Sequence, residues 1–260
     1  MLGSLSILTA VFGGVKHGRR QVSSGLTIES WAFWSPEGGT PREWRDHWAK
    51  DGAAAQPGRV PDDAVPVAHR RRMSALSRLA VQIGLQASRE SRADFLVFCS
   101  QHGELVRSRE LLGRIATSVE LSPTAFSQSV HNTSAGLYTI VSQSQVPATA
   151  LASGPNTFAY GWLEAEAYLL ENPWARVLLV SYEDLLPAEY LPYSAQKQCM
   201  YGLGLLLRVE RGGLSLNSVA AETDELLPMA PLFMAWWLSD EPAMKISADG
   251  QGWAWKRNGS

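Results

Sequence analysis

The chain has 260 residues, 45% of them apolar, so it is long enough to bury one sizeable core or two small ones. Its 23 basic and 25 acidic residues give a formal net charge of −2, which creates no overall field that would attract nucleic acid or an anionic membrane. The two cysteines, Cys99 and Cys199, lack the spacing of metal ligands. We therefore expect a globular cytoplasmic protein with no structural disulfide, metal or other cofactor.

The N-terminal segment does not resemble a targeting signal. Its apolar run, Leu5 to Phe12, is too short to span a bilayer. The basic residues follow this run instead of preceding it, which is the reverse of a secretory signal. We expect residues 1–24 to be a loosely attached extension and residues 25–260 to form one domain.

The first predicted element is a strand from Leu26 to Trp34, because apolar and polar residues alternate in this segment and β-prone residues are frequent in it. Trp44 and Trp48 lie four residues apart, which indicates a short helix. The segment 51–66 is rich in Ala, Gly, Pro and Asp and predicts a surface loop.

A basic run, Arg70 to Arg72, then precedes a helix. Such a run could contact a phosphate or an acidic carrier protein, or it could be solvated surface. The apolar residues that follow it recur with the helical period and predict an inward-facing stripe. They are Leu76, Leu79, Ala80, Ile83 and Ala87.

The apolar run Phe95 to Cys99 predicts a buried strand, and its end offers a first candidate for catalysis. A nucleophilic Cys99 would need a nearby base, such as His102, and a stabilised thiolate. Because Cys99 lies within the apolar run, we interpret it as a buried structural residue. We expect His102 and Glu104 to hold the following loop by hydrogen bonds. The helix Leu105 to Ile115 should then turn Leu111, Leu112 and Ile115 inward.

The stretch from Phe126 to Gly154 is the centre of the predicted architecture. It predicts a helix, a polar turn and a short buried strand that ends at a corner of small residues, from which a long helix starts at about Asn156. In α/β proteins, chemistry is done at such carboxyl ends of strands. The corner residue is Leu151, whose side chain has no reactive group.

The rest of the chain alternates further strands and helices. The helix from Asn156 carries an inward stripe of Phe158, Trp162, Ala165 and Leu169. Later elements are a strand Val177 to Tyr182 capped by Glu183 and Asp184, a strand Tyr201 to Val209, a closing helix Leu226 to Leu238, and a final edge at Trp253 to Arg257. This order predicts a layered α/β fold with a mostly parallel, mixed sheet.

Several motifs resemble the short β-ketoacyl-synthase-like proteins of bacterial aryl polyene gene clusters, which are described as chain length factors. They are Arg71-Arg72-Met73-Ser74, Val97-x-Cys99-Ser100-x-His102-Gly103-Glu104, Leu121-Ser122-Pro123-x-x-Phe126-Ser127-x-Ser129-Val130-His131-Asn132 and Ala135-Gly136-Leu137. The resemblance implies a thiolase-like fold, similar to the N-terminal half of a condensing ketosynthase.

The resemblance also implies that the chain is not catalytic. Ketosynthases carry Thr-Ala-Cys-x-Ser-Gly at the corner, where this chain has Thr149-Ala150-Leu151-Ala152-Ser153-Gly154. A leucine cannot become a thiolate that carries an acyl chain. The family takes two catalytic histidines from the second half of its fold, and this chain has no histidine after Gly154.

The resemblance therefore implies a subunit that pairs with a cysteine-bearing ketosynthase and meets the acyl carrier protein through that complex. The strand from Val146 to Ala150 would pair across the two-fold axis, and Phe126, Ser129 and Leu137 would line or block the acyl tunnel. We expect a structural or interface role for His131. The full set of expected interface and tunnel residues is Phe126, Ser129, His131, Asn132, Leu137, Val146, Ala148, Thr149 and Ala150.

The alternative is a free-standing condensing, decarboxylating or hydrolytic acyltransferase that uses Ser153, or Cys99 with His102. The sequence has no Gly-x-Ser-x-Gly elbow, HExxH helix or phosphate-binding glycine loop that would favour another enzyme class. The 10 tryptophans could anchor an interface or fill the core.

Overall fold

The structure is a computed structural model that describes residues 24–36, 43, 58–194 and 196–258. The predicted N-terminal extension lies outside the described residues except for Ser24, which begins the first strand. The predicted helix at Trp44 and Trp48 also lies outside them. The described part of the predicted loop, residues 58–66, contains no helix or strand, as expected.

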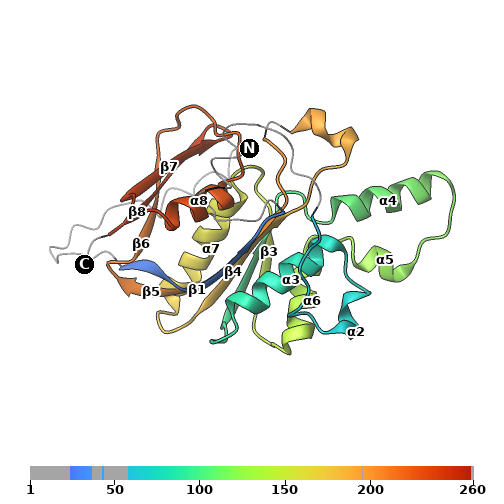
Figure 1. The fold of residues 1–260 in the computed structure, drawn as a ribbon, viewed down its shortest axis with the longest axis horizontal. Helices are drawn as coiled ribbons and strands as arrows, with labels where there is room; N and C mark the ends of the chain where they lie inside the picture. Colours follow the sequence, from blue (N-terminus) through green and yellow to red (C-terminus); the bar gives the residue numbers. More distant parts are fainter. Residues whose placement is uncertain (1–23, 37–42, 44–57, 195, 259–260) are drawn as a thin grey trace, which may run out of the picture.

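Eight strands form one mixed sheet (Figure 1), in the order β3-β2-β4-β5-β1-β6-β8-β7. The strands are β1 Ser24–Trp34, β2 Phe95–Cys99, β3 Ala148–Leu151, β4 Val177–Glu183, β5 Tyr201–Arg211, β6 Leu214–Val219, β7 Ala243–Ala248 and β8 Gln251–Arg257. β2 pairs in parallel with β3 and β4, whereas the other neighbours are antiparallel. The sheet is therefore mixed, as predicted, but it is not mostly parallel, because five of the seven pairings between described strands are antiparallel.

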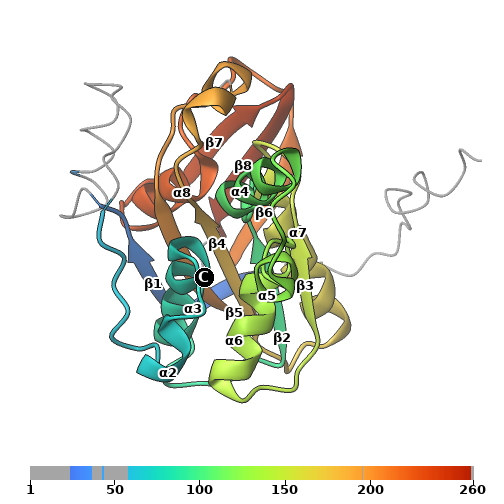
Figure 2. The same ribbon diagram turned by 90° about the vertical axis from the view of Figure 1, so that its right-hand side faces the viewer.

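Helices cover both faces of the sheet (Figure 2). They are α2 Val67–Arg70, α3 Ala75–Ala87, α4 Leu105–Ala116, α5 Pro123–Ser127, α6 Thr133–Ser142, α7 Thr157–Glu171 and α8 Met229–Trp237, with a 3-10 helix η1 at Ala188–Tyr193. Buried strand residues divide between one core under α3 and α6 and another under α7 and α8. On β2, for example, Leu96 and Phe98 face the first core and Val97 faces the second. The result is a three-layer α/β/α arrangement.

The two predicted helical stripes are confirmed. All the inward-facing residues predicted for α3 and α7 are buried. The start of α3 is fixed by Ser74, whose hydroxyl accepts a hydrogen bond from the Ser77 amide, the usual role of a serine N-cap. On α7, Trp162 is fully buried and packs against Phe158 and Phe233. These tryptophan and phenylalanine rings fill the core beneath α7 and α8.

The prediction for α4 was wrong at two of its three positions. Leu111 is buried, but the side chains of Leu112 and Ile115 are 60% and 57% exposed. Figure 1 shows the reason: α4 and α5 project together from the body of the molecule, so α4 has a neighbour on only part of its surface. The apolar pattern of α4 therefore reflects an open face as well as a core contact.

The C-terminal region also differs from the prediction. β6 and β7 were not predicted, and β8 lies between them instead of forming a final edge. α8 begins at Met229, not at Leu226, because Pro228 occupies its N-cap with a ψ of 139°, outside the helical range. α8 does not close the fold, since β7 and β8 follow it.

Candidate functional site

The corner at the end of β3 lies at the edge of the sheet. β3 is partly exposed, not buried as predicted, because β2 is the only strand of the described residues that pairs with it. The Leu96 amide donates to the Pro147 carbonyl (3.1 Å) and the Ser100 amide donates to the Leu151 carbonyl (3.3 Å). Because backbone groups alternate sides along a strand, those of Ala148 and Ala150 point away from β2, toward the open edge.

The corner itself is a turn held by hydrogen bonds, and Leu151 contributes no reactive group to it. The Leu151 side chain packs against the core under α7. Gly154 has a φ of +53°, a left-handed conformation that suits glycine. The Thr157 hydroxyl accepts from the Ser153 amide (2.8 Å) and donates to the Gly154 carbonyl (2.7 Å), which ties the turn to the start of α7. An apolar side chain thus occupies the place where β3 ends.

Ser153 and His131 are the two further candidates for a catalytic role in this region. Within the described residues, no hydrogen bond is made by the Ser153 hydroxyl, so it has no positioned base. The His131 ring lies 2.8 Å from the Ser100 carbonyl through Nε2. It also packs against Gly103, where an added Cβ would come within 2.9 Å of the ring. These contacts give His131 a structural role in the loop after β2.

Cys99 is a poor nucleophile. Its side chain is fully buried, and its Sγ lies against Gly161 of α7. Burial raises the pKa of the Cys99 thiol to about 12, so the thiolate does not form at neutral pH. The interpretation of Cys99 as a structural residue is therefore supported, and its pairing with His102 for catalysis is not.

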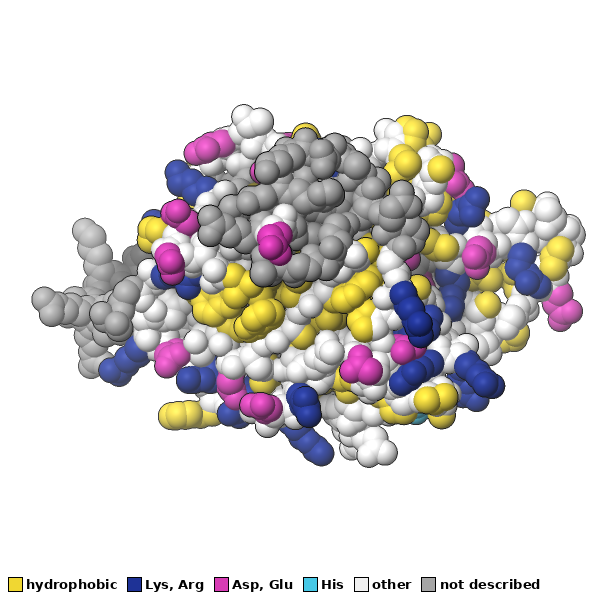
Figure 3. All heavy atoms as spheres, viewed as in Figure 1, with side chains coloured by type: hydrophobic (Ala, Val, Ile, Leu, Met, Phe, Trp, Pro, Cys, Tyr) yellow, Lys and Arg dark blue, Asp and Glu magenta, His cyan; other side chains and the backbone are white. Residues whose placement is uncertain are grey.

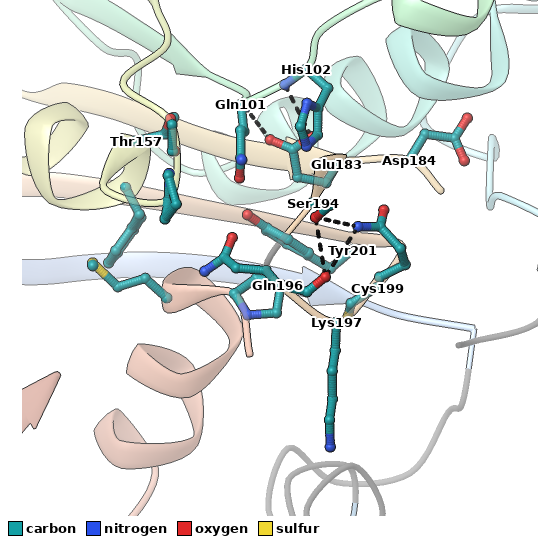
Figure 4. Close-up of a pocket in the computed structure, with 16 residues that line it drawn as sticks. Gln101, His102, Thr157, Glu183, Asp184, Ser194, Gln196, Lys197, Cys199 and Tyr201 are labelled. Carbon is teal, nitrogen blue, oxygen red and sulfur yellow. Dashed lines mark hydrogen bonds between the residues drawn. The ribbon is translucent and has the colours of Figure 1, made fainter. Parts of the chain in front are cut away.

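A narrow polar cleft lies at the carboxyl ends of β2 and β4, next to the corner (Figure 4). Glu183 forms its base and accepts hydrogen bonds from the backbone amides of Gln101 and His102. Gly154 and Thr157 line the same cleft. The space inside the cleft that water can reach is small, about 30 Å³. The position of Glu183 at the end of β4 is predictable from the sequence, but its hydrogen bonds to the loop after β2 are not.

Burial raises the pKa of Glu183 from 4.5 to about 8, although the two amide hydrogen bonds oppose this shift. Between these values the folded chain keeps a proton that the unfolded chain has lost. The proton on Glu183 therefore contributes fully to the stability of the folded chain below pH 4.5, and this contribution is lost as the pH rises toward 8. Burial also lowers the pKa of His102 and raises that of Asp184.

We expect the Glu183→Gln variant to lose a pH dependence that the wild-type chain shows. The free energy of unfolding of the wild type should fall as the pH rises from about 5 to about 8, by up to about 1.4 kcal/mol per pH unit from this group. The difference between the two proteins in urea unfolding at several pH values measures this contribution. A parallel pH dependence in the two proteins would contradict a raised pKa at Glu183.

Glu104 has the structural role predicted for it. It is buried and accepts hydrogen bonds from the hydroxyls of Ser74 (2.6 Å) and Ser77. These bonds tie the loop before α4 to the start of α3. His102 contributes to the same loop through its backbone amide, which donates to Glu183.

The expected interface residues fall into two groups. Leu137 on α6 and the segment 146–150 lie at the open edge of the sheet, where α6 flanks β3. Phe126 and Ser129 lie on and just after α5, and the Phe126 side chain is 62% exposed. His131 and Asn132 connect the groups, since Asn132 is the N-cap of α6. The structure therefore does not bring the two groups into one pocket.

A basic groove runs between the end of α2, α4 and α5. We use this name for the groove lined by Arg71, Arg72, Arg107 and Arg114, where Glu110 is the acidic residue. In Figure 3, basic side chains gather over this part of the molecule. None of the four arginines forms an ion pair with a described carboxylate. The neighbouring Arg70, by contrast, forms an ion pair, since its Nη1 lies 3.2 Å from Asp62 Oδ1. Of the basic run, therefore, Arg71 and Arg72 have no ion pair with a described carboxylate, whereas Arg70 has one.

In the part of the chain that the structure describes, no helix is long and apolar enough to cross a membrane. The same residues contain no group of three or more His, Cys, Asp or Glu side chains placed to hold a metal ion.

The sequence matches a known protein family over most of its length. Residues 42–256, most of the chain, match the family described as the β-ketoacyl synthase N-terminal domain. The chain belongs to this family. No curated protein sequence is significantly similar to the chain.

Solved structures of β-ketoacyl synthases and their partners have the same fold. One chain of the structure described as a ketosynthase (ApeO) in complex with its chain length factor (ApeC), from Xenorhabdus doucetiae, is 31% identical, with a TM-score of 0.77. The match covers 90% of this chain and 99% of that one. The thiolase-like ketosynthase fold predicted from the motifs is confirmed.

Two more distant structures share the fold alone. A β-ketoacyl synthase from Burkholderia phymatum STM815 is 13% identical with a TM-score of 0.56, over 77% of this chain and 66% of that one. The ishigamide ketosynthase/chain length factor is 19% identical with a TM-score of 0.55, over 75% and 67%. The chain thus spans about two thirds of these longer proteins and nearly all of the matched Xenorhabdus chain.

Proposed function

We propose that this protein is a noncatalytic subunit, similar to a chain length factor, that pairs with a cysteine-bearing β-ketoacyl synthase and shapes its acyl tunnel. The observation that carries the proposal is Leu151 at the end of β3, where a condensing enzyme needs a thiolate. The buried, protonated Cys99 and the unassisted Ser153 offer no replacement. The complex would act in a type II polyketide or fatty-acid-like pathway, with aryl polyene synthesis as the specific proposal.

The open edge of β3 is the proposed seam between the subunits. Ala148 and Ala150 present backbone groups that pair with no other strand among the residues that the structure describes. An exposed strand edge of this kind can pair with a strand of another chain. Antiparallel pairing with the equivalent strand of the synthase would extend the sheet across both subunits and place α6 beside the partner's tunnel.

The exposed apolar side chains of the α4–α5 pair support contact with a second protein, and Phe126 is the one that we assign to the tunnel. Phe126, Leu112 and Ile115 are each more than half exposed, although such side chains are stabilised by burial. A projecting pair of helices that carries apolar side chains is suited to insert against a second protein. We propose that Phe126 and Ser129 limit the space available to the growing chain from α5 and the residues just after it, and that Leu137 limits it at a separate place, from α6.

The acyl carrier protein is the second proposed partner, and it would meet this chain through the complex. The cysteine of the synthase would take the acyl group from the carrier's thioester, since a thiolate can attack such a carbonyl. This chain would contribute no reacting group to that exchange.

Assembly is tested by co-expressing this chain with a candidate β-ketoacyl synthase from the same gene cluster. Size-exclusion chromatography with mass determination should show a one-to-one complex. If the chain instead elutes as a monomer beside a synthase homodimer under all tested salt conditions, the partnership is wrong for that synthase.

A further inference from the structure

A cavity of about 270 Å³, lined by Arg89 and Arg92, lies at the amino ends of β2 and β3, the opposite ends from the corner. Its walls come from the end of α3, the loop 88–94, the start of β2, and the end of α6 with the segment that follows it. It shares no lining residue with the polar cleft or the basic groove. We call it the distal cavity, and the proposed function does not use it.

The loop 88–94 is tied to three neighbouring elements through its side chains. These side chains are Ser88, which donates to the Gly84 carbonyl of α3 (2.7 Å), Ser91, which donates to the Glu29 carboxylate of β1 (2.9 Å), and Asp94, which accepts from the Arg176 backbone amide just before β4 (2.8 Å). Arg89 and Arg92 lie between these anchored residues. The loop therefore holds both arginines at the cavity without using their side chains.

Arg89 and Arg92 bring unpaired positive charge to the distal cavity. Both are exposed, and neither guanidinium forms a hydrogen bond or an ion pair with a described residue. None of the described residues that line the cavity is acidic. Arg176 and Arg208 differ in this respect, because both form ion pairs with Glu29. The two arginines of the cavity thus stay available to a bound anion.

Beneath the arginines the distal cavity is apolar. Leu96 of β2, Ala93 and the Tyr138 ring are buried, and Leu85 adds half-buried apolar surface. An added Cβ at Gly84 would come within 2.9 Å of the Tyr138 ring, so α3 and α6 approach each other closely here. An anion that also carries an apolar group would gain free energy by covering this surface.

Few other polar groups remain free for a ligand. The Ser88 hydroxyl already donates to Gly84, so it accepts from the Tyr138 hydroxyl, 2.8 Å away. Burial raises the pKa of Tyr138, so this hydroxyl keeps its proton at neutral pH. The Ser144 hydroxyl makes no hydrogen bond with a described residue. The lining therefore suits a ligand with one charged head and an apolar remainder.

We propose that the distal cavity binds a small carboxylic acid with an apolar body, its carboxylate between Arg89 and Arg92 and its body against Leu85 and the Tyr138 ring. Guanidinium groups match a carboxylate through paired, charge-assisted hydrogen bonds. Small-molecule sites usually combine apolar walls with a few polar groups that fix the ligand's orientation. The bound acid would also contact the segment after α6 that leads into β3.

The site is tested by isothermal titration of the purified chain with benzoate. Benzamide has the same ring without the charge, and acetate has the charge without the ring. The variant is Arg89→Gln with Arg92→Gln, which keeps two polar side chains and removes their charge. The matched control is Arg71→Gln with Arg72→Gln, two exposed arginines without ion pairs that line the basic groove, outside the distal cavity.

We expect the wild type and the control to bind benzoate equally, and the Arg89→Gln, Arg92→Gln variant to bind it about ten- to a hundredfold more weakly, because hydrogen bonds to a charged group are lost. Benzamide and acetate should each bind the wild type more weakly than benzoate does. Leu85→Gln keeps both arginines and should also weaken benzoate binding. Circular dichroism and urea unfolding check that each variant folds.

No binding of benzoate to the wild type, equal losses in variant and control, or equal affinity for benzoate and benzamide would overturn the inference. Tighter binding of inorganic phosphate than of benzoate would identify a phosphate site and also overturn it. If the double variant does not fold, Leu85→Gln decides, since unchanged benzoate affinity there contradicts the apolar contact. The synthase takes no part in these titrations, so their outcome is independent of the proposed function.

Discussion

Replacing Ala150 with proline should weaken the complex with the ketosynthase about five- to a hundredfold. The backbone N–H of Ala150 points away from β2, and proline would remove it from the open edge. Losing one intermolecular hydrogen bond, together with the clash of the proline ring, costs about 1–3 kcal/mol. Titration of purified chains, or the fraction that co-elutes in size-exclusion chromatography, measures the loss.

The matched control for this experiment is Ala150→Val, which enlarges the side chain but keeps the N–H. Both substitutions leave intact the bonds from β2 to the Pro147 and Leu151 carbonyls, so each variant should fold. Edge strands tolerate proline where its missing donor faces outward. If Ala150→Pro binds the synthase as tightly as the wild type, the subunits do not pair through the edge of β3.

Replacing Phe126 with alanine should shift the products of the complex toward longer chains. The Phe126 side chain is 62% exposed on α5, so its removal should cost this chain little stability. If the ring closes the end of the partner's tunnel, each further extension forces atoms into occupied space at a cost of about 1–3 kcal/mol. Its removal should favour the next extension about ten- to a hundredfold, which mass spectrometry of the released acyl chains can measure.

Leu112→Ala is the control for the tunnel prediction, because Leu112 is similarly exposed on the adjoining helix α4 and was not assigned to the tunnel. Its product lengths should match those of the wild type. An unchanged product distribution with Phe126→Ala would show that α5 does not reach the growing chain. A shift with Leu112→Ala alone would move the length-limiting contact to α4.

Most of the core could be predicted from the sequence because its signals are local. The stripe of α7 follows from the helical period of its apolar residues, and β4 follows from an uninterrupted apolar run. Both are buried as predicted. β7 could not be found this way, since Ala243–Ala248 is short and its lysine and serine interrupt the apolar pattern. β6 alternates Leu214, Ser215 and Leu216 after a two-glycine turn, a hairpin signal that was present in the sequence.

The parts of the site that escaped prediction depend on contacts between distant segments. Nothing near Glu183 in the sequence indicates that its carboxyl receives the amides of Gln101 and His102. The basic groove likewise joins Arg71 and Arg72 to arginines of α4, far along the chain. The exposed leucine and isoleucine of α4 were misassigned because apolar periodicity marks a face to be covered but not whether the cover belongs to the same chain.

The most direct test of the noncatalytic role compares two forms of the purified complex in carrier-dependent condensation. In one, alanine replaces the nucleophilic cysteine of the synthase, and in the other Ser153→Ala changes this chain. Our account predicts that the first form is inactive and that the second condenses at the wild-type rate. Condensation that survives loss of the synthase cysteine but disappears with Ser153→Ala would place the nucleophile in this chain and contradict the account.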